Sequence, residues 1–192
     1  AAYKISTLAI VPSIIIQNAF FPQLSRAVEQ KSRVSLYKKY SKAIYVIGAL
    51  AGVLTFFYSD FLISSLLSSE YQNSIVLMRL FAFSIFIVFL NVSLASSLVA
   101  WKKEKLVVKA TIFAVVMNII MDLIFIPEFG AYGATIATIV SEFTLFVALS
   151  YNVYNVIKRI HLHYIVAVIL IGLLSIIPSY YYLNENLGNI IG

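Results

Sequence analysis

The chain has 192 residues, 61% of them hydrophobic and 11% charged, and this composition excludes a soluble globular domain because no core of that size could bury so much apolar surface. Its net charge of +6 does not indicate a nucleic-acid partner, since the basic residues lie in short connections between apolar segments. Without cysteine the chain has no disulfide framework and no thiolate metal site, and we expect neither a metal nor another cofactor.

About six apolar segments follow one another along the chain, each close to the ~20 residues that a helix needs to cross a bilayer. They cover residues 3–22, 43–67, 75–100, 106–126, 131–157 and 164–183. The apolar runs are continuous rather than alternating, which favours helices over the strands of an outer-membrane barrel. The predicted fold is therefore all-α, a polytopic bundle of about six transmembrane helices.

Basic and nearly non-basic connections alternate between these segments. The positive-inside rule places the basic connections in the cytoplasm. Their cations are Arg26, Lys31, Arg33, Lys38, Lys39 and Lys42 after the first segment, Lys102, Lys103, Lys105 and Lys109 after the third, and Lys158 and Arg159 after the fifth. The opposite connections, SSEYQNS and PEFGAYG, are predicted to face outward.

Proline and glycine give further local predictions. Pro12 and Pro178 lie inside predicted helices and should bend them, whereas Pro22 and Pro127 should mark the ends of theirs. The pair Gly48-x-x-x-Gly52 predicts close packing against another helix.

The segment from Gln23 to Lys42 combines apolar residues with six cations. It predicts either an interfacial amphipathic helix on an anionic leaflet or a plain topology signal. His161 and His163 lie two residues apart and so do not share a helix face, which favours an interfacial role over a metal pair.

The fourth and fifth segments carry the polar residues of most functional interest. One helical stripe consists of Thr111, Ala114, Asn118 and Asp122, and another of Ala131, Thr135, Thr138 and Glu142. Charged groups are costly in hydrocarbon, so both stripes should face protein or a cavity.

Depth separates the candidate cavity or coupling residues. At 1.5 Å per residue, Glu142 lies about 15 Å below Tyr132, near the midplane of a ~30 Å core, and Asn118 lies about level with it. We therefore expect the Asn118 side chain to approach Glu142, and Glu142 to titrate during transport. The remaining candidates, Asp122, Arg79 and Asp60, lie closer to the outer ends of their segments.

Three stretches resemble a known family. The segment NIIMDLIFIPEFGAYGATIATIVSE, from Asn118 to Glu142, is similar to a stretch of bacterial polysaccharide-export flippases of the MOP superfamily. The opening AAYKISTLAIVPSIIIQNAFFPQLS and the segment SSEYQNSIVLMRLFAFS resemble two further stretches of that family, although the first has Ala-Ala-Tyr-Lys where the family has Tyr-x-x-Ala-x-Lys.

The resemblance implies a multi-pass carrier of the bacterial inner membrane. Such a carrier passes a polyprenyl-pyrophosphate-linked oligosaccharide to the outer leaflet, as in the export of capsule or of the O-antigen of lipopolysaccharide. It has two lobes of six helices around a polar cavity. Residues 1–157 would be the second lobe without its first helix, 164–183 an additional helix and 184–192 an outer tail. The implied partners are lipid-linked oligosaccharide, membrane lipids and the N-terminal lobe of the same protein.

We expect the chain to be a fragment, because neither Met nor a charged leader precedes its first apolar run, and we expect no enzymatic activity. An integral-membrane glycan polymerase or ligase is one alternative, although it needs a sizeable outer loop and the outer connections have about seven residues or fewer. The others are a related carrier, such as a lipid II flippase or a cation-coupled drug exporter of the same superfamily, and a purely structural subunit.

Overall fold

The computed structural model describes residues 2–66 and 74–158, and every element in that part of the chain is a helix. Five of the six helices are long and apolar enough to span a membrane, so the predicted all-α transmembrane fold is confirmed. The predicted segments 164–183 and 184–192 lie outside the described residues. The helices are α1 (Ala2–Arg26), α2 (Gln30–Phe57), α3 (Ser59–Leu66), α4 (Ser74–Ala100), α5 (Glu104–Phe129) and α6 (Ala131–Ile157).

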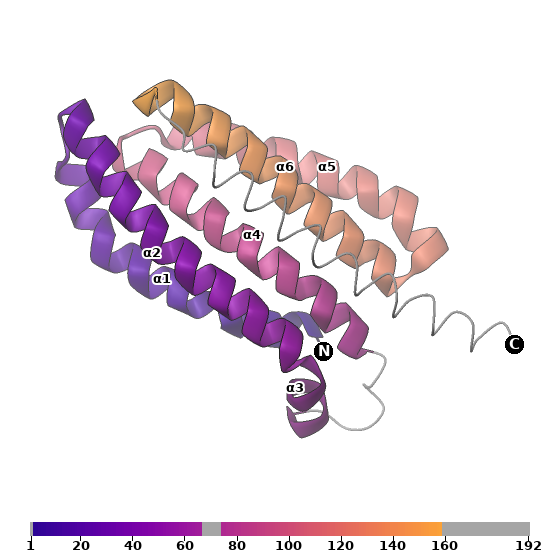
Figure 1. Cartoon of the computed structure of the whole chain (residues 1–192). Coiled ribbons are helices and arrows are strands. Elements are labelled where there is room, and N and C mark those ends of the chain that lie inside the picture. Colours follow the sequence, from indigo (N-terminus) through magenta and orange to yellow (C-terminus); the bar gives the residue numbers. More distant parts are fainter. Residues whose placement is uncertain (1, 67–73, 159–192) are drawn as a thin grey trace, which may run out of the picture.

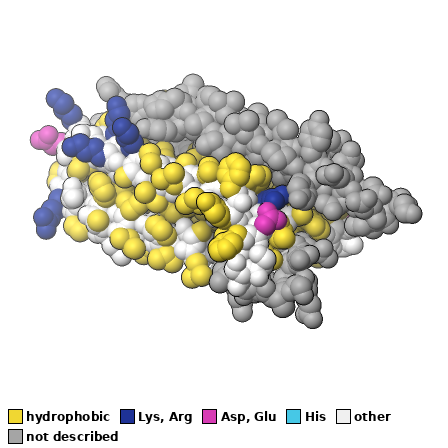
Figure 2. All heavy atoms as spheres, turned by 60° about the horizontal axis from the view of Figure 1, so that its bottom comes forward, with side chains coloured by type: hydrophobic (Ala, Val, Ile, Leu, Met, Phe, Trp, Pro, Cys, Tyr) yellow, Lys and Arg dark blue, Asp and Glu magenta, His cyan; other side chains and the backbone are white. Residues whose placement is uncertain are grey.

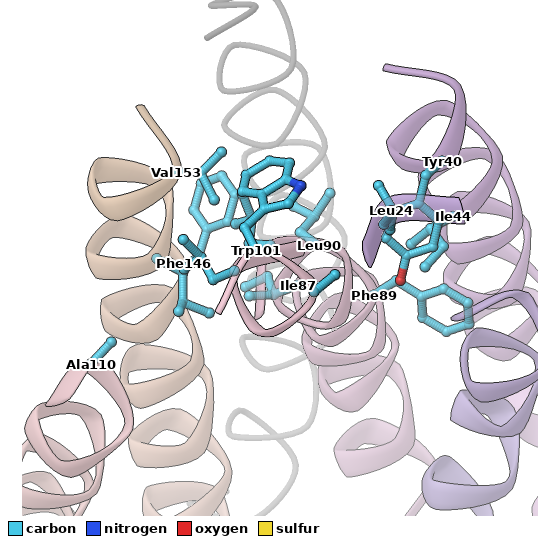
Figure 3. Close-up of a cluster of buried hydrophobic side chains, with 14 of the residues drawn as sticks. Leu24, Tyr40, Ile44, Ile87, Phe89, Leu90, Trp101, Ala110, Phe146 and Val153 are labelled. Carbon is cyan, nitrogen blue, oxygen red and sulfur yellow. The ribbon is translucent and has the colours of Figure 1, made fainter. Parts of the chain in front are cut away.

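Helix α4 lies at the centre of the bundle. It is the most apolar of the spanning helices, and it packs against α1 and α2 on one side and α6 on the other. The cluster of buried side chains in Figure 3 shows this arrangement, with Leu24 and Tyr40 on one side of α4 and Phe146 and Val153 on the other. Helix α5 packs mainly against α6 and so lies at the edge of the bundle (Figure 1).

Helix α2 begins 13 residues earlier than residue 43, where the sequence predicted it to begin. The prediction of a separate interfacial helix in the segment from Gln23 to Lys42 was therefore wrong, because α1 continues to Arg26 and α2 starts at Gln30. The reason is that most apolar side chains of this segment pack on the bundle, although Val28 is 80% exposed. Leu24 and Tyr40 are fully buried, and the Tyr40 hydroxyl lies 2.7 Å from Ser96 Oγ on α4.

The predicted segment 43–67 is also divided. Helix α2 ends at Phe57, and Tyr58, with φ −96° and ψ 11°, separates it from the short helix α3. At two further points the helices continue past a proline that was predicted to end them, since α1 runs on beyond Pro22 and α5 beyond Pro127. Next to Pro22, the Ser25 hydroxyl donates to the Phe21 carbonyl at 2.8 Å, which adds a bond to this last turn of α1.

The three basic connections lie at one end of the bundle (Figure 1). Figure 2 shows Lys and Arg side chains gathered at that end, with hydrophobic side chains over much of the neighbouring surface. Gln30 links two of the connections, because its Nε2 donates to the Ile157 carbonyl at 3.2 Å. Basic connections that alternate with non-basic ones along the chain should all lie on one side of the membrane, and the bundle places them at one end.

Gly48 and Gly52 bring α2 close to α4. A Cβ on Gly48 would lie 2.6 Å from the Phe89 Cβ, and one on Gly52 would lie 3.0 Å from the Ala82 carbonyl oxygen. Both glycines are buried, so the close helix approach predicted from the sequence is confirmed.

Replacing Gly48 should destabilise the bundle. We expect Gly48→Val to cost about 1–3 kcal/mol, because the added side chain must displace Phe89 from a packed core. The measurement is the thermal unfolding midpoint of the full-length protein in detergent. Leu50→Val, on the exposed face of the same helix, is the control and should leave the midpoint almost unchanged. An equal midpoint for Gly48→Val would contradict the packing described.

The orientation in the membrane can be tested by cysteine labelling. Lys31→Cys, Lys103→Cys and Lys158→Cys should all be protected from an impermeant reagent added outside sealed cells, because their positions lie at the basic end. Phe129→Cys, at the opposite end of α5, should react. Labelling of any two of the first three would overturn the orientation.

Candidate functional site

A polar contact joins two spanning helices near the middle of the bundle. Asn91 on α4 donates through Nδ2 to Oε2 of Glu142 at 2.7 Å and to the main-chain oxygen of Glu142 at 3.0 Å. Asn91 is 5% exposed and Glu142 is half-buried. At 1.5 Å per residue, Glu142 lies ~17 Å from the start of α6 and ~22 Å from its end. The contact therefore lies near the middle of the predicted span of α6, where hydrocarbon provides no hydrogen-bond partner.

The helical repeat explains why these two residues face each other. Glu142 lies on the same face of α6 as Phe146, Leu149 and Val153, and these apolar residues belong to the buried cluster around α4. On α4, Asn91 likewise lies in a row with Ile87, Leu94 and Leu98, which belong to the same cluster. Two apolar rows that pack together thus each contain one polar group, and these two groups bind each other.

The prediction that Asn118 is the partner of Glu142 was wrong, because the donor is Asn91 on α4. The hairpin itself forms as expected, since Gly130 alone separates α5 from α6 and the two helices pack along each other. The depth of Glu142 stays a prediction, but its side chain points toward α4. Asn118 and Asp122 are half-buried on α5, and neither side chain forms a hydrogen bond within the described residues.

Sequence reasoning did not single out Asn91, although a signal for it exists. It is the only amide side chain in the apolar segment 75–100. A lone amide in such a segment is costly unless it finds a partner inside the protein. The same criterion that selected Glu142 would have selected Asn91.

The hydroxyl groups of the predicted α6 stripe are satisfied within their own helix. Thr135 donates to the Ala131 carbonyl and Thr138 to the Ala134 carbonyl, each at 2.9 Å. Such bonds leave a threonine without need of a partner on another helix. Glu142 is thus the member of this stripe that depends on a neighbouring helix.

Arg79 and Asp60, two further predicted candidates, bind each other at the end of the bundle opposite the basic connections. Arg79 Nη2 lies 2.6 Å from Asp60 Oδ2, and its Nε donates to Ser59 Oγ at 3.0 Å. The guanidinium carbon also lies 5.9 Å from the centroid of the Phe56 ring. Asp60 is 55% exposed, so water screens this pair, and its main effect is to tie α3 to the start of α4.

Other polar atoms near α4 have no partner within residues 2–66 and 74–158. They are the Asn91 Oδ1, the Ser93 hydroxyl and the indole nitrogen of Trp101, all of them buried. The same part of the chain contains no group of three His, Cys, Asp or Glu residues able to hold a metal ion. His161 and His163 lie outside it.

Comparisons with known proteins identify relatives of the chain. The model of the family described as lipid II flippase MurJ matches residues 7–186. The chain is 27% identical over 169 residues to the probable low-salt glycan biosynthesis flippase Agl15 of Haloferax volcanii, an alignment that covers 85% of this chain and 33% of that protein. It is 20% identical over 139 residues to the capsular polysaccharide biosynthesis protein CapF of Staphylococcus aureus, covering 71% of this chain and 35% of that one.

The chain thus spans about a third of the length of the curated relatives that it matches. No solved structure matches it with significance.

A double-mutant cycle measures the contact between α4 and α6. We expect Asn91→Leu to destabilise the protein only while Glu142 is present, so that Asn91→Leu and Glu142→Leu couple by about 1 kcal/mol, within the range of hydrogen bonds between membrane helices. The measurement is the free energy of unfolding of the full-length protein in mixed micelles. Asn118→Leu combined with Glu142→Leu is the control and should show additive effects. If the effects of Asn91→Leu and Glu142→Leu on the free energy of unfolding are additive, and those of Asn118→Leu and Glu142→Leu are coupled, the partner of Glu142 is Asn118.

Proposed function

The chain belongs to the lipid II flippase MurJ family, and we propose that it forms part of a carrier that moves a lipid-linked oligosaccharide across a membrane. One observation supports this most directly. In a chain matched over residues 7–186 by a flippase family, two spanning helices meet through the Asn91–Glu142 contact rather than through apolar packing alone. Polar groups at this depth are costly to insert and are typically retained for transport.

The physical task of such a carrier explains why polar groups are needed at mid-depth. A sugar headgroup carries many hydroxyl groups, and each loses its hydrogen bonds to water when it enters hydrocarbon. A protein lowers this cost by lining a path with groups that can donate or accept hydrogen bonds. We propose that the helices up to residue 157 form one wall of that path and that the segment 164–183 adds a further helix beside it.

We propose that a second set of helices, an N-terminal lobe of the same protein, forms the opposite wall. The curated relatives are about three times as long as the part that matches this chain, which supports a larger working unit. Alternating access needs two bundles that move against each other around a central site. The helices described here would then provide one of the two moving parts.

The finer assignment of the substrate is also a proposal. We propose a repeat unit on polyprenyl pyrophosphate, destined for O-antigen or capsule and carried across a bacterial inner membrane. The name of CapF supports capsular polysaccharide, whereas Agl15 is named for a low-salt glycan and comes from Haloferax volcanii. Both names agree on glycan biosynthesis, and neither refers to O-antigen.

The candidate residues take different roles in this proposal. Glu142 would change its protonation state during transport, with Asn91 holding its carboxyl group toward α4. Asn118 and Asp122 would line the path on α5, the edge helix. Arg79 and Asp60 would shape its outer end, where their ion pair fixes α3.

Members of flippase families are transporters rather than enzymes, which distinguishes this proposal from a membrane glycan polymerase or ligase. The described part of the chain agrees with a transporter, because the connection between α5 and α6 at the outer end is a single glycine, too short to hold catalytic side chains.

Leaflet transfer by the full-length protein tests the proposal. The protein is reconstituted in liposomes with a fluorescent polyprenyl-pyrophosphate-linked sugar, and the fraction of headgroups that a membrane-impermeant reagent can reach is followed over time. We expect Glu142→Gln to slow transfer at least about tenfold, which corresponds to ~1.4 kcal/mol. Glu128→Gln removes an exposed carboxylate at the end of α5 and is the matched control, with transfer unchanged.

Two outcomes would contradict the proposal. Absence of transfer by the wild-type protein, with the labelled lipid present in both leaflets of control liposomes, would exclude this substrate class. Full transfer by Glu142→Gln across a range of pH would exclude the role of Glu142 while leaving the flippase assignment in place.

A further inference from the structure

Helix α5 carries a row of exposed side chains on the face turned away from the bundle. Residues in the row are spaced alternately by four and three, so they lie one above another on the helix. We call this row the lysine stripe, and its members are Lys105, Lys109, Ile112, Val116, Ile119 and Leu123. The four apolar members are 47–73% exposed, and both lysines are exposed as well.

The packing of α5 fixes the direction in which the lysine stripe points. Ala110 and Ala114 are the buried residues of this helix, and α5 packs mainly against α6. At 100° per residue these two alanines lie opposite the stripe. The stripe therefore faces away from α6.

The charged residues of the lysine stripe lie at one end only, which is the basic end of the bundle. Lys105 and Lys109 form no ion pair within the described residues. The acidic residues of α5, which are Glu104, Asp122 and Glu128, lie off the stripe by the same helical spacing. Beyond Lys109 the stripe is apolar for ~21 Å, more than half of a ~30 Å hydrocarbon core.

We propose that the lysine stripe of α5 binds a phospholipid with an anionic headgroup, its phosphate at Lys105 and Lys109 and an acyl chain along Ile112, Val116 and Ile119. Complementary charge supports this occupant, because two unpaired ammonium groups lie at the end of the helix where the positive-inside rule places the anionic leaflet. Long lysine side chains near a helix end reach the headgroup region while their stems lie along apolar surface. A protein partner that covered the apolar part of the stripe would instead have to cover two unpaired lysines beside it.

The proposal does not depend on transport, because its readout is lipid retention. Native mass spectrometry of the full-length protein, released from detergent with increasing amounts of phosphatidylglycerol, gives the affinity for each bound lipid. On the lysine stripe each lysine contacts the bound headgroup and should contribute about fivefold in affinity, so Lys105→Gln with Lys109→Gln should weaken phosphatidylglycerol binding about 25-fold. Phosphatidylcholine, with its neutral headgroup, should bind weakly to both proteins.

The matched control is the double variant Lys31→Gln with Lys38→Gln. It removes the same charge from exposed positions at the same end of the molecule, but on α2. We expect less than about a twofold change in affinity for this variant, since its positions lie off the lysine stripe. Equal losses in the two double variants, or no loss in either, would overturn the proposal. Unfolding midpoints of both variants show whether the fold is retained.

A cross-linking experiment tests the apolar part of the lysine stripe. Val116→Cys carries a photoactivatable group, and the full-length protein is irradiated in vesicles of phosphatidylcholine and phosphatidylglycerol. We expect the product to be a phospholipid adduct, enriched in phosphatidylglycerol by comparison with Val53→Cys on α2. A cross-link within the polypeptide would show that protein covers the stripe. Displacement of the adduct by a polyprenyl-pyrophosphate lipid would assign the stripe to that lipid, and either result would overturn the proposal.

Discussion

Helix α4 is surrounded by other helices, and a buried polar group on it is stabilised only by a partner inside the protein, because hydrocarbon provides none. The Ser93 hydroxyl has no such partner within the described residues. The Asn91 amide nitrogen finds a partner in Glu142, and the Ser96 hydroxyl finds one in Tyr40. The first contact joins α4 to α6 and the second joins it to α2. The two sides of the bundle are therefore connected through α4 by hydrogen bonds as well as by apolar packing.

The depth of each polar contact determines what it contributes. Asp60 is 55% exposed, so its ion pair with Arg79 is screened and serves mainly to place α3. The Asn91–Glu142 contact lies among apolar residues, where an unpaired carboxylate or amide costs much more than it does in water. A change in the protonation state of Glu142 would therefore change the strength of the interaction between α6 and α4. This is the physical basis on which we propose a part in transport for Glu142.

Much of the fold follows from the sequence, because continuous apolar runs bounded by Lys, Arg and Gly specify spanning helices directly. The start of α2 did not follow, since Gln30–Lys42 is rich in cations and only its buried face, with Tyr40, reveals that it belongs to the bundle. Helical rise predicts a depth for Glu142, but it does not predict the partner of Glu142. Rise fixes how deep a residue lies, whereas the direction it faces depends on which helix packs on each side, and that is set by the tertiary arrangement.

The central claim is the hydrogen bond from the Asn91 amide to the Glu142 carboxylate. Solid-state NMR of the full-length protein in bilayers, with ¹⁵N in asparagine side chains and ¹³C in glutamate carboxyl groups, measures it directly. A separation of 2.7 Å between Nδ2 and Oε2 places the two labelled nuclei within ~4 Å of each other, and the dipolar signal should disappear in Asn91→Leu. A signal that survives Asn91→Leu and disappears in Asn118→Leu would contradict the account.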